Sequence, residues 1–597
     1  MPELCSVNVF RDHKRLTLSL STPELSTGIM QKKWTTKKVD EDVVLQLQHN
    51  LNIHPLICRL LVQRGITTPE AAASYFDASL RELHDPFLMK DMQKAVDRLH
   101  EAINNKEKIL IYGDYDVDGT TSVTLLYTFL ERRHSSLGFY IPDRYREGYG
   151  LSFQGIDYAA EQGYQLIITV DCGIKAVEQV KYANSKGIEV IICDHHLPGT
   201  ELPPAAAILD PKQEDCPYPY KHMSGCGIAF KFVQAFEQEN NIPIEELTSL
   251  LDLVVASIAS DIVPLTGENR ILARHGLRQL NYTHRPGLLA LMQQGNLRRP
   301  MRIRDIVFGL APIINAAGRL SSAEQAVKLM LARTRMLARE YADELEVCNK
   351  IRREFDQKTA EEAEELLVNH PELRDRKSII LYQPHWHKGV IGIVASRIAE
   401  KYHKPTVILT QSEDDVVGSA RSVSQFDIHD IIESCSDILI NYGGHKYAAG
   451  MTLTAEHLSE FQERFEERVA TAILPAQEKP VLEISGELEI SEINHNLWNQ
   501  LSKLEPFGPG NMQPIFLCRG VRDSGHSRTM HGRHLRLSLK KDSNRIASAF
   551  AFGKADLLEK VRKSRSFDVC FTLQKNGSSR RAPIQMNIQD IRFPDDS

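Results

Sequence analysis

The fold of this chain is decided by residues 109–119, which read Ile109-Leu110-Ile111-Tyr112-Gly113-Asp114-Tyr115-Asp116-Val117-Asp118-Gly119. The apolar run predicts a buried strand, and the alternating acids follow it directly, before a helix that we expect to begin near Thr121. In open α/β sheets the carboxyl ends of the strands are the edge where ligands bind, and closely spaced acids concentrate negative charge that a bound cation offsets. The stretch therefore predicts an α/β fold with a metal site.

An aspartate-rich turn has two other interpretations. The first is a calcium-binding EF-hand loop, which carries a glutamate at its twelfth position, where this chain has Leu125. The second is a solvated turn that binds no metal, and this alternative stays open for the stretch taken alone. The missing glutamate argues against calcium.

Two further predicted strands end in groups of the same chemistry. Residues 166–170 run into Asp171, and residues 188–193 run into Asp194-His195-His196. Strands that alternate with helical patterns between about Ala95 and Ile262 predict βαβ units and a parallel sheet with helices on both faces. An aspartate after a strand is often only the N-cap of the next helix, which stays open for Asp171 by itself. Together, three strands bring carboxylates and imidazoles to one edge.

Asp261 completes this set at the end of an apolar helix that begins near Leu250. Taken alone, Asp261 would be an ordinary residue at the end of a helix. It becomes a candidate metal ligand only because the other acids are present. Carboxylate and imidazole ligands without thiolates suit Mn²⁺ or Mg²⁺ better than structural zinc, and a site rich in acids can hold two ions. Two such ions activate water and stabilise the oxygens of a displacement at phosphorus. The residues therefore predict phosphoester hydrolysis.

The bulk properties set the class of protein. A chain of 597 residues with 42 % hydrophobic content should form three or four domains. It has neither an apolar run that could span a bilayer nor a basic-then-apolar leader, so we expect a cytoplasmic protein. Ten cysteines without CxxC pairs argue against a disulfide framework and a structural zinc site. The net charge of −6 does not favour nucleic acid, so charge has to be considered segment by segment.

The pattern along the chain predicts five parts. They are an N-terminal extension over 1–29 that is disordered or non-native, a parallel-sheet catalytic domain with an N-terminal helical part over 30–320, a long connecting helix over 321–375, a second α/β domain over 376–475 and a small β-barrel over 476–597. Met30 opens a basic stretch and is a more natural beginning than Met1. The charge-rich helix is expected to be a solvated connection, with a binding face as the alternative.

The C-terminal part concentrates positive charge despite the acidic total. The residues are Arg519, Arg522, Arg528, Arg533, Arg536, Lys540 and Lys541. A basic face on a small barrel is what an OB-fold uses to follow the backbone of a single strand, and a merely soluble strand surface is the alternative.

The acids and histidines carry a family resemblance. Asp114-x-Asp116 with Gly119, then Asp171, then Asp194-His195-His196, then Asp261 match in order the motifs of the DHH phosphoesterase superfamily, which is named for the triplet. From about Met30 the chain is similar to the bacterial single-strand-specific exonucleases of that superfamily, on the segments 112–119, 142–150 and 314–319. Segments 386–397, 418–422 and 443–450 resemble the DHH-associated domain, and 504–511 resembles the start of an OB-fold domain.

The resemblance implies a role for each motif residue. The metal ligands would be Asp114, Asp116, Asp171, His195 and Asp261, with Asp171 as the bridge between two ions of Mn²⁺ or Mg²⁺. Catalytic support would come from His196, which contacts the scissile phosphate, and from Asp118 and Asp194, which orient the ligands. Substrate would be bound by Arg144, Ser419 and Arg421 at the 5′-terminal phosphate and by Arg319 and His445 along the strand.

One position departs from the pattern of some relatives, which have a ligating histidine four residues before the first acid. This chain has Leu110 there, which leaves the occupancy of the first metal position open.

The resemblance implies a metal-dependent exonuclease that hydrolyses single-stranded DNA from 5′ to 3′ to mononucleotides in recombination and repair. It also implies a monomer that acts with a single-strand-binding protein and a helicase and not with a membrane. Two other classes stay open. One is a phosphodiesterase of small substrates, whose members generally lack the basic barrel. The other is a non-enzymatic binding module, against which the complete ligand set argues.

Overall fold

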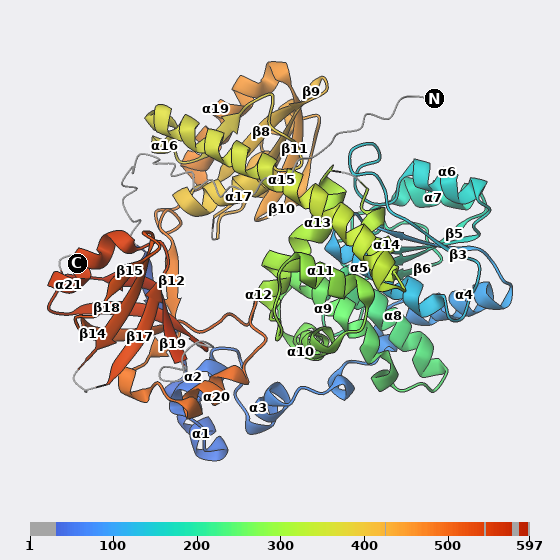
Figure 1. Cartoon of the computed structure of the whole chain (residues 1–597). Coiled ribbons are helices and arrows are strands. Elements are labelled where there is room, and N and C mark those ends of the chain that lie inside the picture. The colour runs from blue at the N-terminus through green and yellow to red at the C-terminus, as the bar shows by residue number, and fades with distance from the viewer. Residues whose placement is uncertain (1–31, 321, 424, 542–544, 576–583, 595–597) are drawn as a thin grey trace.

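The computed structural model describes residues 32–320, 322–423, 425–541, 545–575 and 584–594. The expectation for residues 1–29 lies outside this described part of the chain. Figure 1 shows two α/β lobes joined by one long helix, and a barrel that carries the C-terminal strands. The predicted fold class is confirmed: a parallel-sheet domain, a long connecting helix, a second α/β domain and a C-terminal OB-fold.

The first lobe is built on a five-stranded parallel sheet with strand order β3-β2-β4-β5-β6. Its strands are β2 (Ile109–Gly113), β3 (Leu137–Tyr140), β4 (Leu166–Val170), β5 (Glu189–Cys193) and β6 (Ala207–Leu209). Ile109 and Ile111 face one hydrophobic core while Leu110 and Tyr112 face another. Because both faces are buried, the strands are continuous apolar runs and not alternating ones.

Helices cover both faces of this sheet. The helices of the first lobe are α4 (Met92–Asn104), α5 (Val117–Leu130), α6 (Phe153–Glu161), α7 (Val177–Ser185), α8 (Gly225–Glu239), α9 (Leu251–Ser260), α10 (Gly267–Tyr282), α11 (Pro286–Gln294), α12 (Ile303–Asp305), α13 (Ala311–Leu320) and α14 (Glu324–Leu331). α5 begins at Val117, four residues before the expected start, because Asp116 caps it by accepting a hydrogen bond from Gly119 N–H. Asp116 is therefore the N-cap of α5, and Asp118 lies in the first turn of this helix.

The connecting helix α15 spans Arg335–Asn369. The connecting helix expected over 321–375 is divided, since α14 ends at Leu331 and α15 starts anew with Thr334 as its N-cap. Its buried positions include Ala338, Ala342 and Leu345, so a narrow stripe packs on the first lobe while most of the surface is polar. Further along, Ala363 and Leu367 pack against the second lobe, so the same helix fixes the distance between the two lobes.

The second lobe contains a five-stranded mixed sheet with strand order β10-β11-β9-β8-β7, in which β7 and β8 are parallel and the other pairs antiparallel. The strands are β7 (Ile379–Tyr382), β8 (Thr406–Ser412), β9 (Asp415–Arg421), β10 (Asn441–His445) and β11 (Ala448–Thr454). The helices are α16 (Pro371–Asp375), α17 (Ile391–Tyr402), α18 (Ile428–Glu433) and α19 (Leu458–Ala472).

The C-terminal barrel is a seven-stranded sheet that the pairing of β14 with β16 closes. Its strands are β13 (Gly486–Glu487), β14 (Phe516–Asp523), β15 (Arg528–Met530), β16 (His534–Lys540), β17 (Ile546–Ala551), β18 (Phe567–Lys575) and β19 (Ile584–Arg592). Helices α20 (His495–Ser502) and α21 (Leu558–Lys563) lie beside it, and β1 (Lys33–Thr36) pairs in parallel with β12 (Val481–Ile484).

The N-terminal helices belong to the barrel side of the molecule. These are α1 (Glu41–Leu51), α2 (Pro55–Val62) and α3 (Pro69–Phe76). Leu47, Leu60 and Ala72 share one hydrophobic core with the barrel residues Leu497 and Phe571. The sequence expectation placed these helices with the parallel sheet; their apolar periodicity predicts that they are helices but not which core they enter. Among the described helices, none is long and apolar enough to cross a membrane.

Candidate active site

The first part of the site is the turn between β2 and α5, which bears Asp114 and Asp116. Gly119 lies so close to this turn that a Cβ atom on it would come within 2.4 Å of the Asp114 carbonyl oxygen. From the other side, Asn315 of α13 accepts a hydrogen bond from Val117 N–H at 3.1 Å. The acidic turn is thus held between its own helix and a second helix about 200 residues along the chain.

Asp171 follows β4 in the left-handed region of backbone conformation, with φ of 62°. This conformation is uncommon for a residue other than glycine and is held here by neighbours. Its carbonyl oxygen accepts a hydrogen bond from the Tyr149 hydroxyl at 3.0 Å. A Cβ atom on Gly225, the first residue of α8, would lie 2.6 Å from the Asp171 side chain. Only a glycine at that position leaves room for the carboxylate.

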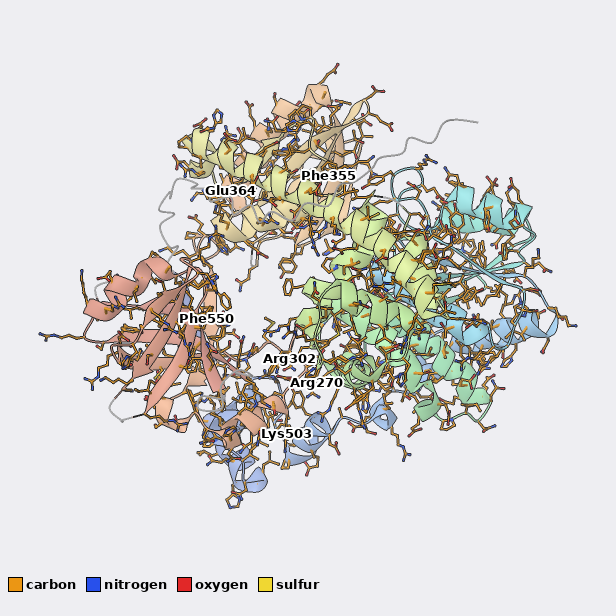
Figure 2. The ribbon with its side chains drawn as sticks, viewed as in Figure 1. Arg270, Arg302, Phe355, Glu364, Lys503 and Phe550 are labelled. Carbon is orange, nitrogen blue, oxygen red and sulfur yellow. The ribbon has the colours of Figure 1, made fainter. Side chains whose placement is uncertain are left out.

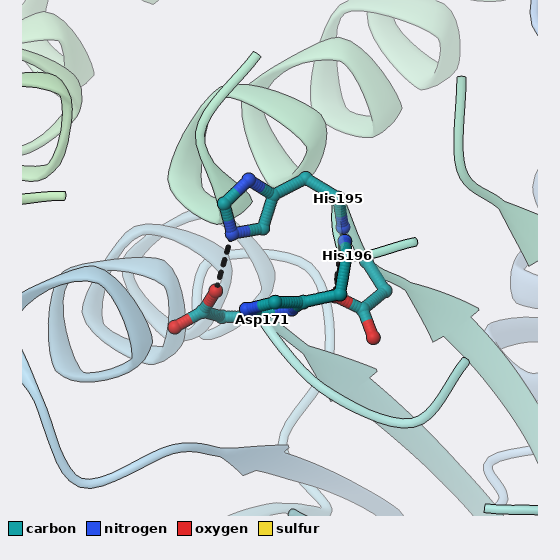
Figure 3. A group of neighbouring side chains, drawn as sticks. Asp171, His195 and His196 are labelled. Atoms are coloured by element: carbon teal, nitrogen blue, oxygen red, sulfur yellow. Dashed lines mark hydrogen bonds and ion pairs between the residues drawn. The ribbon is translucent and has the colours of Figure 1, made fainter. Parts of the chain in front are cut away.

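In the triplet after β5, Asp194 holds the two histidines in place, and His195 offers a ring nitrogen as a metal ligand (Figure 3). Asp194 Oδ1 accepts hydrogen bonds from His195 N–H at 2.7 Å and from His196 Nδ1 at 2.7 Å. The bond between His195 Nδ1 and the Met223 carbonyl oxygen, 3.0 Å long, makes Nδ1 the donor. His195 Nε2 then presents its lone pair toward Asp171 Oδ1 at 3.1 Å. This is the arrangement of an imidazole ready to bind a metal.

Asp118 is buried and fully hydrogen-bonded. It accepts from the backbone N–H groups of Gly225 and Cys226 at 2.7 and 2.8 Å and from the Ser257 hydroxyl at 2.7 Å. It therefore fastens the start of α8 and the middle of α9 to α5. Since Asp261 is the C-cap of α9, the bond from Ser257 to Asp118 also places the last acid of the set.

The predicted metal ligands come together in space. Side-chain atoms of Asp114, Asp116 and Asp171 lie within 4.8 Å of one another, as do those of Asp118, His195 and Asp261 and, in a further group, those of Asp171, Asp194, His195 and His196. Asp114 Oδ1, Asp171 Oδ1 and His195 Nε2 are buried without a hydrogen-bond partner in the described part of the chain. Buried polar atoms of this kind are costly unless something binds them.

The pKa shifts of the cluster residues also indicate a bound cation. Burial, followed by the charges of neighbouring aspartates, raises the pKa of Asp114, Asp171 and Asp261 well above the ordinary range of a carboxyl. Burial lowers the pKa of His195 to about 4, which keeps its imidazole neutral. A divalent cation relieves the repulsion among the acids and accepts the neutral imidazole as a ligand. The residues present therefore fit Mn²⁺ or Mg²⁺.

A second group of polar side chains, which we call the candidate phosphate pocket, lies in the other lobe at the start of α17 and consists of Ser396, Ser419 and Arg421. Arg421 Nη1 donates to the Ser419 hydroxyl at 2.9 Å and Arg421 Nε donates to the Ser396 hydroxyl at 3.1 Å. A Cβ atom on Gly392 would lie 2.8 Å from Arg421 Nη2, so the arginine rests directly on the first turn of α17. Among the described residues, no side chain of the N-cap accepts a hydrogen bond from this helix, and the helix N-terminus and Arg421 together favour an anion.

Arginines of the two lobes approach each other around this pocket. Burial lowers the pKa of Arg319 to about 10, with the charge of Arg144 as the next cause, and Arg144 likewise lowers the pKa of Arg421 after burial. Arg319 donates to the Gly389 carbonyl oxygen of the second lobe at 2.8 Å. Among the described residues, no carboxylate forms an ion pair with Arg144, Arg319 or Arg421. Mutually repelling cations without a counter-ion mark a site for a polyanion.

His445 lies close enough to Arg421 and to His196 for both charges to act on it. Its side chain remains accessible, but surrounding protein removes part of its hydration, and this effect lowers its pKa together with the charges of Arg421 and His196. The sequence interpretation missed Lys212, whose charge acts on both His196 and His445. It follows β6, a strand of three residues that is too short to recognise from its pattern. It also missed Ser257, for which the sequence gives no signal, and it assigned no role to Ser396, although this residue lies in the segment 386–397 that resembles the DHH-associated domain.

Family models match three segments of the chain. They are the DHH family, N-terminal domain at residues 108–258, the DHHA1 domain at 375–471 and the RecJ OB domain at 484–590. The chain is 36 % identical to the single-stranded-DNA-specific exonuclease RecJ of Bacillus subtilis over 566 residues, which cover 94 % of this chain and 70 % of that protein. It is 32 % identical to RecJ of Escherichia coli over 93 % of this chain and 98 % of that one.

The chain belongs to the RecJ family. The predicted resemblance to the DHH superfamily is thereby confirmed. The crystal structure of RecJ in complex with Mn²⁺ from Thermus thermophilus matches with a TM-score of 0.81 and 27 % identity, over 94 % of this chain and 80 % of that one. A second crystal structure of the same RecJ holds Mg²⁺. The predicted cofactors agree with these two relatives and with the unpartnered ligand atoms of this chain.

Proposed function

We propose that this chain is a metal-dependent exonuclease that hydrolyses single-stranded DNA from the 5′ end to mononucleotides, in DNA recombination and repair. The observation that carries the proposal is that the chain contains both an acidic site and a basic site whose charges are not neutralised by neighbouring residues. Buried carboxylate oxygens that accept no hydrogen bond from the described residues lie at the edge of the parallel sheet, and Arg144, Arg319 and Arg421 form no ion pair with a described carboxylate. Membership of a family whose members are named single-stranded-DNA-specific exonucleases supports the same substrate.

Five side chains would hold the metal: Asp114, Asp116, Asp171, His195 and Asp261. Asp171 takes part in two of the ligand groups, which supports its role as the bridge. When bound, two divalent cations supply an activated water and neutralise charge on the phosphoryl oxygens. Asp118 keeps α5, α8 and α9 in register, so that the ligands at their ends stay in place.

His196 would contact the scissile phosphate. The Asp194 carboxylate accepts a hydrogen bond from its Nδ1 at 2.7 Å. Burial lowers the pKa of His196, but this bond and the negative charge of Asp194 outweigh burial and raise it. The Tyr149 hydroxyl lies 3.3 Å from the ring nitrogens and steadies it from the other side. A protonated imidazole can donate Nε2–H to a phosphate oxygen and stabilise the charge that develops there.

The pocket at the start of α17 would set the polarity. Ser419, Arg421 and Arg144 bind a 5′-terminal phosphate, while Arg319 and His445 hold the strand that follows it. Because a terminal phosphate is bound before the neighbouring bond is cut, each round releases one nucleotide. The basic barrel then holds the distant part of the strand.

The cellular context is also part of the proposal. Single-stranded DNA is the macromolecular partner, and a single-strand-binding protein and a helicase would supply and unwind it. We propose that the enzyme acts in the cytoplasm as a monomer, since both lobes of the site come from one chain.

The test is digestion of single-stranded and duplex DNA with Mn²⁺, on substrates labelled separately at the 5′ and the 3′ end. We expect early release of the 5′ label as a mononucleotide, from single strands only. Asp171→Asn should abolish the release, because asparagine accepts the left-handed backbone but lacks the charge. Asp414→Asn, on the exposed turn between β8 and β9, is the matched control and should retain full activity.

Other outcomes separate the alternatives. Cleavage of short oligoribonucleotides or cyclic dinucleotides without attack on DNA would establish a phosphodiesterase of small substrates. Binding of single strands without any cleavage would establish a binding module.

A further inference from the structure

An aromatic cluster lies on the outside of the barrel and does not belong to its core. The rings are those of His534, at the start of β16, Phe550, near the end of β17, and Phe552, in the turn that follows β17. The Phe550 and Phe552 centroids are 4.4 Å apart, and His534 lies 5.8 and 5.3 Å from them. The hydrophobic core of the barrel contains their neighbours Ala549 and Ala551 instead. Phe550 is half-buried, and Phe552 is 62 % exposed, which is unusual for so large an apolar side chain.

The cluster is held in place by the backbone. Gly553 N–H donates to His534 Nδ1 at 3.0 Å, and Gly553 adopts a φ of 65° that suits glycine. This bond ties the turn that carries Phe552 to the start of the neighbouring strand. Phe552 is therefore presented to solvent on a fixed turn.

Positive charge lies beside the rings on the same face. Arg536 is directly opposite Phe550 across the β16–β17 pair, and Arg528 is directly opposite Arg536 across the β15–β16 pair. Lys540, two positions after Ser538 on the same face of β16, is opposite Arg522. Like charges directly opposite each other destabilise a sheet, and among the described residues no acid forms an ion pair with Arg522, Arg528 or Arg536.

Rings and unpaired arginines together fit a single nucleic-acid strand better than a protein surface. Arginines neutralise phosphates, while exposed rings offer stacking faces to bases of any sequence. Figure 2 places Phe550 on the side of the barrel that faces the long helix α15, where Phe355 is labelled, and not on the outer rim of the molecule. A strand that leaves the metal-ligand cluster toward the barrel would meet this side.

We propose that His534, Phe550 and Phe552 form a base-stacking platform, on which nucleobases of the single strand stack while Arg528 and Arg536 hold its phosphates. The inference rests on the proposed function for its ligand and deepens it, because it assigns the barrel contacts with bases as well as with backbone. The platform makes binding depend on unpaired, accessible bases. Duplex DNA, whose bases are already stacked and paired, gains nothing from it.

The test is equilibrium binding measured by fluorescence anisotropy in EDTA, so that no strand is cut. Three 5′-phosphorylated ligands with a 3′ label are compared: an oligothymidine of about 6 nucleotides, one several times as long, and an abasic strand of the longer length. Phe552→Ala should weaken binding of the long oligothymidine about tenfold but leave the affinity for the abasic strand as it was. Tyr282→Ala, which removes an aromatic side chain that is 71 % exposed at the end of α10, is the matched control and should bind all three ligands normally.

The variants separate stacking from charge and from folding. Arg536→Ala should weaken binding of both long strands by the same factor. Phe552→Leu keeps an apolar side chain without a π face and should bind like Phe552→Ala, with the unfolding temperature of the wild type. Unchanged affinity for the long oligothymidine, or an equal loss on the abasic strand, would overturn the proposal. Since binding is measured without hydrolysis, its outcome is independent of whether the chain proves to be an exonuclease.

Discussion

The metal-ligand cluster and the basic face of the barrel both carry excess charge, but they differ in how far that charge is buried and paired. In the cluster, acids of four segments lie together in or near the protein interior, and three ligand atoms have no hydrogen-bond partner in the described residues. On the barrel the arginines are exposed, and some are already neutralised, as when Arg519 pairs with Glu487 and Asp568 at 2.9 and 3.5 Å. Buried charge responds strongly to the loss of one member, whereas exposed charge is screened and shared. Single substitutions should therefore have large effects in the first region and small ones in the second.

The largest effect is expected at Asp171. Asp171→Asn should lower kcat/KM for single-stranded DNA at least about a thousandfold, because several kcal/mol of charge stabilisation depend on the metal centre. The same variant should unfold at an equal or higher temperature than the wild type in EDTA, since it removes one of several repelling carboxylates. Activity is measured on an end-labelled strand and unfolding by circular dichroism. An active Asp171→Asn would remove this residue from the centre.

The next effect concerns the phosphate pocket. Arg421→Ala should lower the preference for a 5′-phosphorylated strand over a 5′-hydroxyl strand about 10- to 100-fold, the worth of charge-assisted hydrogen bonds. Arg421→Lys keeps the charge without the planar fork and should restore only part of the preference. The measurement is kcat/KM on the two substrates side by side. An unchanged ratio would place the terminal phosphate elsewhere.

A smaller effect, on stability, is expected at Ser257, which supports the metal-ligand cluster from outside it. Ser257→Ala removes the hydroxyl that donates to Asp118 at 2.7 Å, and should lower the free energy of unfolding by about 1–3 kcal/mol. Ser260→Ala, three residues later on α9, loses only a hydrogen bond to the Ala256 carbonyl oxygen. It should change the free energy of unfolding by less than about 0.5 kcal/mol. Urea unfolding measures both variants. Equal losses would mean that Asp118 needs no hydroxyl to stay in place.

The smallest effect is expected on the barrel. Arg536→Ala should weaken single-strand binding a few-fold and reduce the slope of log affinity against log salt by roughly 0.7, the value for one phosphate contact on a single strand. Arg519→Ala should change the slope less, because its partners Glu487 and Asp568 already neutralise it. The measurement is a salt titration of binding. A larger change for Arg519→Ala than for Arg536→Ala would reverse the assignment of the binding face.

Much of this molecule could be predicted from its sequence because the decisive signals are local. The strand ends at Asp114, Asp171 and Asp194 could be located, since buried parallel strands are continuous apolar runs and their carboxyl ends meet at one edge. The order of the motifs then identified the superfamily. The separate basic cluster of the barrel predicted its partner class.

What could not be predicted depends on long-range packing. The helices over 41–76 share a core with a barrel more than 400 residues away, and their periodicity cannot name that partner. Asn315 and Ser257 reach the acidic residues only in the folded chain. Lys212 follows a strand of three residues, and Phe552 occupies a turn where a single exposed ring is unremarkable in sequence.

The most direct test is a crystal of this protein grown with Mn²⁺ and a 5′-phosphorylated oligothymidine, with the metal located by anomalous scattering. We expect two anomalous peaks of Mn²⁺ among Asp114, Asp116, Asp171, His195 and Asp261, with the terminal phosphate against Arg421. Peaks confined to another group, such as His429, Asp430 and Glu433 on α18, would contradict it, as would an empty cluster at saturating Mn²⁺.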